Sequence, residues 1–200
     1  MTDILEKGSA GDLFEKSSQP DGSHTFYVGA AWDGDVDLDL MIVPLRKDTA
    51  NAGQVLAASQ DDLCFFNRLD VFSGAIKHSG DALTGDAAGD DESVVIKAES
   101  VPDEIGSLVI GVIAYNVDDM SAATNTKFSI RDGGDVSAPL LFEMPMEAAD
   151  VDGETVLVAC VLTRAENGGF IAKNASAFHT EFGKGRAAIE GLLAVAKNYA

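Results

Sequence analysis

The sequence predicts an all-β fold, an antiparallel β-sandwich of two packed sheets with a short C-terminal helix. Most of the 200-residue chain consists of short apolar, often β-branched segments broken by Gly, Asp, Asn and Pro, which is typical of strands joined by turns. Two such segments, SVVIKAESVP and SLVIGVIAYNV, are separated by only a few residues around PDE. Parallel strands need a crossover connection of about a dozen residues, so antiparallel pairing is favoured.

The strands follow one another along nearly the whole chain. In order, we expect them at Ile4–Lys7, Asp12–Lys16, Thr25–Ala31, Val36–Pro44, Leu63–Asn67, Ile76–His78, Ser93–Ala98, Ser107–Tyr115, Thr126–Arg131, Leu140–Met144, Thr155–Thr163 and Phe170–Lys173. The segment Ser17–Ser23 reads as a turn, and the sequence contains no internal repeat and no linker. We therefore expect one domain over residues 1–200.

The C-terminal segment GRAAIEGLLAVAKNYA has a different pattern. Its apolar residues Ile189, Leu192, Leu193 and Ala196 recur at helical spacing, and β-branched residues are few. This predicts an amphipathic helix over about residues 187–198.

The net charge of −19 limits the classes of partner. Such a chain is repelled by the phosphates of nucleic acids and by anionic membranes, and it attracts cations. The N-terminus MTDILEKGSA lacks a secretory apolar run, and no stretch approaches the roughly 18–20 apolar residues of a membrane span. We expect a cytoplasmic protein without direct membrane insertion. Its two cysteines, Cys64 and Cys160, lie in apolar runs and read as buried free thiols.

Acidic residues gather first in the stretch WDGDVDLDL, residues 32–40, within a segment without Lys or Arg between Lys16 and Arg46. If this stretch is a strand, alternation places all its aspartates on one face and its large apolar residues toward the core. The aspartates are Asp33, Asp35, Asp37 and Asp39.

A second acidic segment, HSGDALTGDAAGDDES, spans residues 78–93 and again contains no basic residue other than its histidine. Its glycines permit tight turns that can fold carboxylates and carbonyls toward one point. Ca²⁺ takes six to eight oxygen ligands, whereas Zn²⁺ prefers Cys and His and Mg²⁺ keeps several waters. The pattern favours calcium binding over acidic loops that are merely solvated. It is not an EF-hand, because Leu38 and Pro44 stand where that loop requires Gly and Glu.

Together these motifs resemble the TerD domain of the tellurium-resistance and general-stress family. The family's central motif is similar to H-S-G-D-x-x-T-G-x-x-x-G-D-D-E, and residues 78–92 match it in order and spacing. WDGDVDLDL, CFFN and VIGVIAY match further parts, LEKGSAGDL at residues 5–13 resembles the first hairpin, and LTRAENGGFIAK at residues 162–173 resembles a late strand pair that retains Arg164. The resemblance covers nearly the whole chain.

The resemblance implies a β-sandwich that binds about two Ca²⁺ ions in adjacent acidic loops. The residues that carry over as metal ligands are Asp37, Asp39, Asn67, Asp81, Gly85 through its carbonyl, Asp90, Asp91 and Glu92, with Asp33 as a weaker candidate. It also implies a non-enzymatic stress-response role of the tellurite-resistance type. The partners would be Ca²⁺ and other stress-response or membrane-associated proteins, with no nucleic acid. The alternative is a divalent-metal-dependent hydrolase that uses the same carboxylates.

His78 opens the second motif and has two possible roles, a base or ligand on one side and a brace for the loop on the other. Calcium sites rarely use imidazole. We therefore expect His78 to hold the loop through packing or hydrogen bonds.

Overall fold

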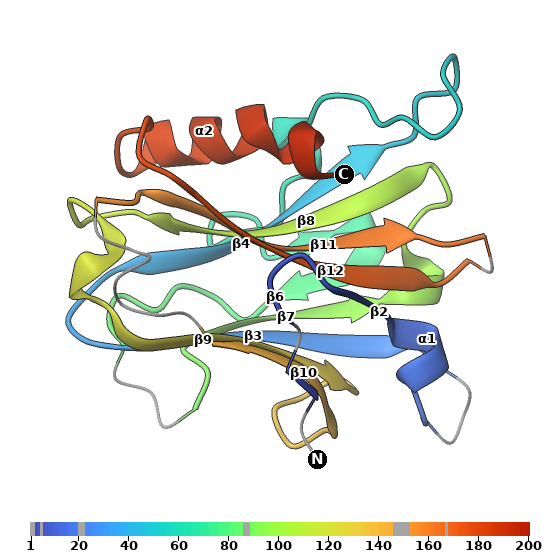
Figure 1. Cartoon of the computed structure of the whole chain (residues 1–200), viewed down its shortest axis with the longest axis horizontal. Coiled ribbons are helices and arrows are strands. Elements are labelled where there is room, and N and C mark those ends of the chain that lie inside the picture. The colour runs from blue at the N-terminus through green and yellow to red at the C-terminus, as the bar shows by residue number, and fades with distance from the viewer. Residues whose placement is uncertain (1–2, 5, 20–22, 86–88, 146–152, 167) are drawn as a thin grey trace.

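The computed structural model describes residues 3–4, 6–19, 23–85, 89–145, 153–166 and 168–200. Two sheets lie face to face, and a helix covers the outer face of one of them (Figure 1). The predicted β-sandwich with a C-terminal helix is confirmed. The pairing is antiparallel throughout, except that the first strand runs parallel to its neighbour β10.

The larger sheet has seven strands in the order β1-β10-β9-β3-β7-β6-β5. Their bounds are β1 Asp3–Ile4, β3 Thr25–Asp33, β5 Asp70–Val71, β6 Ile76–His78, β7 Glu92–Lys97, β9 Thr124–Asp132 and β10 Leu140–Pro145. The smaller sheet has five strands in the order β2-β12-β11-β8-β4. Their bounds are β2 Ala10–Asp12, β4 Leu38–Arg46, β8 Ile105–Ala114, β11 Val156–Arg164 and β12 Phe170–His179.

Strand β4 is buried on both of its faces, which explains its nearly continuous apolar sequence. Leu38, Leu40 and Ile42 belong to the core between the two sheets. Met41 and Val43 alternate with them and belong to a second apolar cluster on the outer face of the smaller sheet. Side chains on the two faces of β4 therefore pack into two different apolar clusters.

Helix α2, Arg186–Ala196, covers that outer face (Figure 1). Ala188, Leu192 and Val195 pack into the second cluster. The prediction of a helix over about 187–198 is confirmed, and its last residues continue as a 3₁₀ turn, Lys197–Tyr199. Other 3₁₀ turns lie at Gln60–Asp62, Phe72–Gly74, Ala98–Ser100 and Met120–Ala122.

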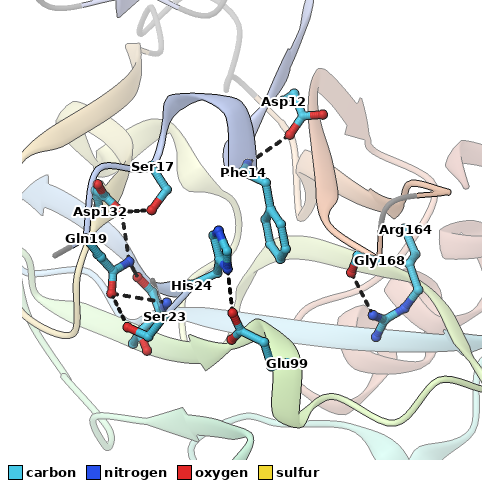
Figure 2. A network of polar contacts seen from close by, with 11 residues as sticks. Asp12, Phe14, Ser17, Gln19, Ser23, His24, Glu99, Asp132, Arg164 and Gly168 are labelled. Atoms are coloured by element: carbon cyan, nitrogen blue, oxygen red, sulfur yellow. Dashed lines mark hydrogen bonds and ion pairs between the residues drawn. The ribbon is translucent and has the colours of Figure 1, made fainter. Parts of the chain in front are cut away.

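The strand expected at Asp12–Lys16 is wrong. The chain leaves β2 at Asp12 and forms a short helix, α1, Leu13–Lys16. The Asp12 carboxylate accepts hydrogen bonds from the backbone N–H of Phe14, at 2.8 Å, and of Glu15, at 3.2 Å. Figure 2 shows the hydrogen bond from Phe14 to Asp12. The Phe14 ring also stacks on the His24 ring, with centroids 3.6 Å apart. The N-cap Asp12 and the contact between the Phe14 and His24 rings thus stabilise a helical turn where the sequence pattern predicts a strand.

The segment that follows α1 is fixed by Asp132 at the end of β9. Its carboxylate accepts hydrogen bonds from Ser17 Oγ at 2.7 Å and from Gln19 Nε2 at 2.8 Å (Figure 2). These bonds lower the pKa of Asp132, although burial works against them as the largest single influence. The turn predicted at Ser17–Ser23 is therefore anchored to the larger sheet at its described residues.

Other strand predictions also differ from the structure, and the strand expected at Phe170–Lys173 continues to His179. The segment Leu63–Asn67 makes only isolated bridges, one of them between Cys64 and Ile42. The strand expected at Val36–Pro44 begins two residues later and ends two residues later. Of the strand expected at Ile4–Lys7, only Ile4 belongs to a strand, β1, and Leu5 lies outside the described residues. In the segment expected to form the first hairpin, residues 5–13, β2 pairs with β12 and β1 pairs with β10, so the two strands do not pair with each other.

Both cysteines are free and buried, as predicted. Burial raises the pKa of the Cys64 thiol and of the Cys160 thiol to about 12. Neither side chain is poised for thiolate chemistry at neutral pH. Among the described helices, none combines the length and the apolar character required to cross a bilayer.

Candidate metal centre

The acidic stretch at residues 32–40 is a crossing between the two sheets rather than one strand. Strand β3 of the larger sheet ends at Asp33, and β4 of the smaller sheet begins at Leu38. Between them Gly34 adopts a φ of +122°, a backbone conformation that favours glycine. The prediction that all the aspartates share one face is therefore wrong.

The break separates the aspartates into two groups. Asp33 and Asp35 are exposed, and Asp33 Oδ2 accepts a hydrogen bond from Asn125 Nδ2 at 2.5 Å. Asp37 and Asp39 are buried, with exposed fractions of 8% and 1%. They flank Leu38, which points into the core between the sheets. Alternation therefore holds for this second pair alone.

Asp81 from the second acidic segment joins the buried pair. One carboxylate oxygen of each residue, Asp37, Asp39 and Asp81, lies within 4.8 Å of the others. Asp37 Oδ1 and Asp39 Oδ2 are buried and have no hydrogen-bond partner in the described part of the chain. A buried, unpaired carboxylate is unfavourable unless it gains a proton or a cation. The three carboxylates are thus a candidate metal centre.

The electrostatics of the cluster are one-sided. Burial raises the pKa of Asp39 to about 8, and the negative charges of Glu92, Asp37 and Asp81 push it in the same direction. Burial also raises the pKa of Asp37, again with help from Asp81 and Glu92. The neighbouring charges that shift the pKa values of Asp37 and Asp39 are all negative. A divalent cation would relieve the repulsion as well as the missing hydrogen bonds.

Glu92 connects the cluster to the edge of β4. Its Oε2 accepts a hydrogen bond from the Leu40 N–H at 2.7 Å, and its Oε1 accepts one from the Ala82 N–H at 3.1 Å. One carboxylate from the larger sheet thus holds both the edge of the smaller sheet and the loop that carries Asp81. Glu92 itself is 1% exposed.

His78 is the second brace at the same edge. Its Nδ1 accepts from the Gly80 N–H at 3.1 Å, so Nε2 carries the proton and donates to the Leu40 carbonyl at 2.9 Å. Together His78 and Glu92 satisfy the backbone of Leu40 where a neighbouring strand would do so. The structure supports the prediction that His78 holds the loop.

The other predicted acidic ligands among the described residues are not part of the three-carboxylate cluster. Asp91 Oδ2 accepts a hydrogen bond from the Trp32 N–H at 2.9 Å. Asp90 covers Gly29, where an added Cβ would lie 2.2 Å from its Oδ2, an atom without a hydrogen-bond partner in the residues described. Asn67 is exposed in the turn that joins Phe65 to Arg68.

Gly85 packs its backbone against Trp32. A Cβ at this position would lie 2.4 Å from the Trp32 carbonyl oxygen, and the Gly85 N–H donates to the Gly34 carbonyl at 2.9 Å. Only glycine fits this contact, which holds the second acidic segment against the crossing at Gly34. Asp86 lies outside the described residues.

Sequence reasoning missed one residue that positions the site. The backbone N–H of Tyr115, just beyond β8, donates to the Asp37 carbonyl at 3.1 Å. This bond fixes Asp37 before β4 begins. Its only signal in the sequence was the motif VIGVIAY, which ends at this tyrosine.

Comparison with known proteins identifies relatives of this chain. The TerD domain model matches residues 1–179. General stress protein 16U of Bacillus subtilis (strain 168) is 32% identical over 123 residues, which cover 59% of this chain and 60% of that protein. Tellurium resistance protein TerD of Serratia marcescens is 36% identical over 95 residues, which cover 44% of this chain and 46% of that protein. The chain thus spans about half to three-fifths of the length of these relatives.

The fold also matches a crystal structure of a homologue of telluride resistance protein (TerD) from Streptomyces coelicolor A3(2). The TM-score is 0.63 at 16% identity, over 88% of this chain and 98% of that chain. This likeness concerns the fold alone. The match to the TerD domain model covers most of the chain, and we conclude that this protein belongs to the TerD domain family.

Proposed function

We propose that the protein is a calcium-binding member of its family that acts in a stress response of the tellurite-resistance type. The observation that carries the proposal is the pair of buried oxygens, Asp37 Oδ1 and Asp39 Oδ2, without a hydrogen-bond partner in the described residues and within reach of Asp81. The stress-response role is supported by the relatives' names, general stress protein and tellurium resistance protein.

Calcium fits this donor set better than other common divalent metals. The cluster consists of carboxylates, which are hard oxygen ligands, and it contains neither Cys nor His. Zn²⁺ favours nitrogen and sulfur, and Mg²⁺ demands near-ideal octahedral geometry, whereas Ca²⁺ accepts irregular oxygen sites. We propose one ion at Asp37, Asp39 and Asp81. A second ion would use the other acidic and carbonyl groups implied by the family, Asp33, Asn67, Gly85, Asp90, Asp91 and Glu92.

The proposed mechanism is electrostatic. Without a cation, the carboxylates of both acidic segments repel one another. Binding neutralises them and stabilises the folded state by mass action, because the unfolded chain lacks the assembled site. A neutralised and ordered surface can then bind other stress-response or membrane-associated proteins in the cytoplasm.

The structure favours this binding role over the alternative of a metal-dependent hydrolase. Such an enzyme needs a base near the metal. His78 is the candidate base in the second acidic segment, and each of its ring nitrogens is engaged by the backbone, Nδ1 by Gly80 and Nε2 by Leu40. Its side chain is also fully buried beside Glu92. We therefore propose a protein without enzymatic activity at this site.

The test is a calorimetric calcium titration of chelator-stripped protein, with magnesium as competitor. We expect binding at micromolar concentrations or tighter, and we expect Asp81→Asn to weaken it by about tenfold to a hundredfold, or ~1.4–2.7 kcal/mol. Asp81 is exposed, so its replacement should leave the fold intact. The matched control is Asp35→Asn, an exposed acid of the first segment that lies outside the cluster.

Asp90→Asn separates the two proposed ions. We expect it to lower the stoichiometry while the Asp81-dependent site remains. If the wild-type protein releases no heat and gains no thermal stability with calcium, the proposal is wrong, and the family relationship then describes only the fold.

A further inference from the structure

A cavity of about 410 Å³ is lined by Tyr115, whose backbone N–H donates to the Asp37 carbonyl of the metal centre. Its walls come from the turn that joins Phe65 to Arg68, from Tyr115 beyond β8, and from the first turns of α2. Small-molecule sites in proteins are commonly hollows of about 300–1,000 Å³. The α2 wall lies beyond the segment that matches the TerD domain model, which ends at residue 179.

Three aromatic rings line the cavity. The Phe65 and Phe66 rings meet edge to face, with centroids 5.1 Å apart and planes at 76°. Phe66 meets Tyr115 in the same way, at 5.0 Å and 73°. Tyr115 is 36% exposed. These rings offer both faces and edges to a flat apolar group.

The cavity lining also carries two positive charges, in a chain whose net charge is −19. Arg68 and Arg186 line it together with a single carboxylate, Asp61. Arg68 is held through Nη1 by the Gln60 carbonyl, and Arg186 through Nε by Glu190 Oε1 at 2.9 Å. A guanidinium has five N–H donors, so each arginine can be anchored to the protein and still bind an anion.

The helix end adds to this charge. Arg186 is the first residue of α2, and the preceding N-cap, Gly185, provides no side-chain cap. The uncapped N–H groups of a first turn carry partial positive charge. This partial charge adds to that of the two arginines that line the cavity.

We propose that this cavity binds a small aromatic anion, a flat ring joined to a phosphate or a carboxylate. The ring packs against Phe66 and Tyr115, and the anionic group pairs with Arg68 and Arg186. The site does not include the three-carboxylate cluster, although Asn67, a proposed ligand of the second ion, also lines the cavity. The Tyr115 N–H donates to the Asp37 carbonyl and so connects the cavity to the cluster.

The test is a titration with phenyl phosphate, followed by chemical shifts of the ¹⁵N-labelled protein. A chelator is present throughout, so that no cation bridges the phosphate to the aspartates. We expect a dissociation constant of about 1 mM or tighter for a ligand of this size. Inorganic phosphate, which lacks the ring, and benzyl alcohol, which lacks the charge, should each bind at least about tenfold more weakly. Benzoate replaces the phosphate by a carboxylate, and the tighter of the two anions identifies the preferred group.

Arg186→Gln removes one charge from an exposed side chain and should weaken phenyl phosphate binding by about fivefold or more. Tyr115→Leu should weaken it through loss of the ring. The matched control is Lys184→Gln, which removes a nearby base that pairs with Asp118 and does not line the cavity. Fluorescence of the single, buried Trp32 verifies that each variant is folded.

Three outcomes would overturn the proposal. They are no shift changes with phenyl phosphate, equal binding of inorganic phosphate, and unchanged binding by both Arg186→Gln and Tyr115→Leu. Because calcium is absent from the titration, failure here leaves the proposed calcium site untouched. Conversely, a failed calcium titration would not account for binding of the aromatic anion.

Discussion

Asp39 is an acid inside an otherwise apolar strand. Its neighbours Leu38, Leu40 and Met41 are essentially inaccessible to solvent, and Asp39 itself is 1% exposed. A leucine there would extend the apolar cluster that begins at Met41, whereas the aspartate leaves a buried oxygen without a hydrogen bond in the described part of the chain. Such a local conflict between stability and residue type is characteristic of functional sites.

The conflict predicts a pH dependence of stability in the calcium-free protein. The folded chain retains the Asp39 proton up to its pKa of about 8, whereas the unfolded chain loses it near pH 3.9. Between these values the native state binds more protons, so the free energy of unfolding falls as the pH rises, by up to ~1.4 kcal/mol per pH unit from this group.

Urea unfolding in chelator at several pH values between 5 and 9 measures this effect. Asp37, whose pKa burial also raises, contributes a slope of the same sign, so the informative quantity is the difference between the wild type and Asp39→Asn. We expect the variant to have the shallower dependence. Equal slopes would show that Asp39 does not retain its proton.

At the scale of elements, the packing of α2 on the smaller sheet depends on a glycine in β8, Gly111. Leu192 is fully buried, and its methyl groups would lie 2.6–2.7 Å from a Cβ at Gly111. The strand therefore needs glycine there because the helix approaches so closely. Met41 and Val109 complete the apolar cluster beneath the helix.

Leu192→Ala should lower the free energy of unfolding by about 2–4 kcal/mol, because it removes buried methyl groups and leaves a cavity between α2 and the smaller sheet. Denaturant unfolding followed by the fluorescence of Trp32 measures the loss. Val136→Ala is the control. Val136 is 51% exposed, so its truncation should change stability by less than about 0.5 kcal/mol. If Leu192→Ala lowers the free energy of unfolding no more than Val136→Ala does, α2 contributes little to the stability of the fold.

At the scale of the whole molecule, the charge of −19 opposes compactness. Basic residues relieve it in exposed pairs such as Lys184 with Asp118. At the metal centre, the charges that shift the pKa values of Asp37 and Asp39 are all carboxylates, and none is a basic residue. Repulsion is thus concentrated where the two sheets are joined.

This distribution predicts a salt dependence. In chelator, the melting temperature should rise between 0.01 and 1 M KCl, because the Debye length falls from about 30 Å to about 3 Å. The calcium-saturated protein should show a smaller rise, since its strongest repulsion is already neutralised. Differential scanning calorimetry of both forms makes the comparison. An equal rise in the two forms would place the repulsion elsewhere on the surface.

The sequence by itself determined the fold class, because strands and helices of this chain carry their own periodicity. The runs at residues 93–98 and 107–115 form strands of the two sheets, and the helical spacing of Ile189 and Leu192 marks α2. It also indicated the burial of both cysteines and the bracing role of His78. The error at Asp12–Lys16 arose because a single capping carboxylate and the ring of His24 decide that conformation.

Only the tertiary structure decided which acids meet. Alternation along one strand would have grouped Asp33 with Asp39, but Gly34 turns the chain from one sheet to the other and leaves Asp33 outside the cluster. Asp81 joins Asp37 and Asp39 because Glu92 and His78 attach its loop to the edge of β4. The cavity beside Tyr115 likewise combines three separate segments. Such contacts between residues far apart in sequence depend on how the sheets stack, and local patterns do not contain that information.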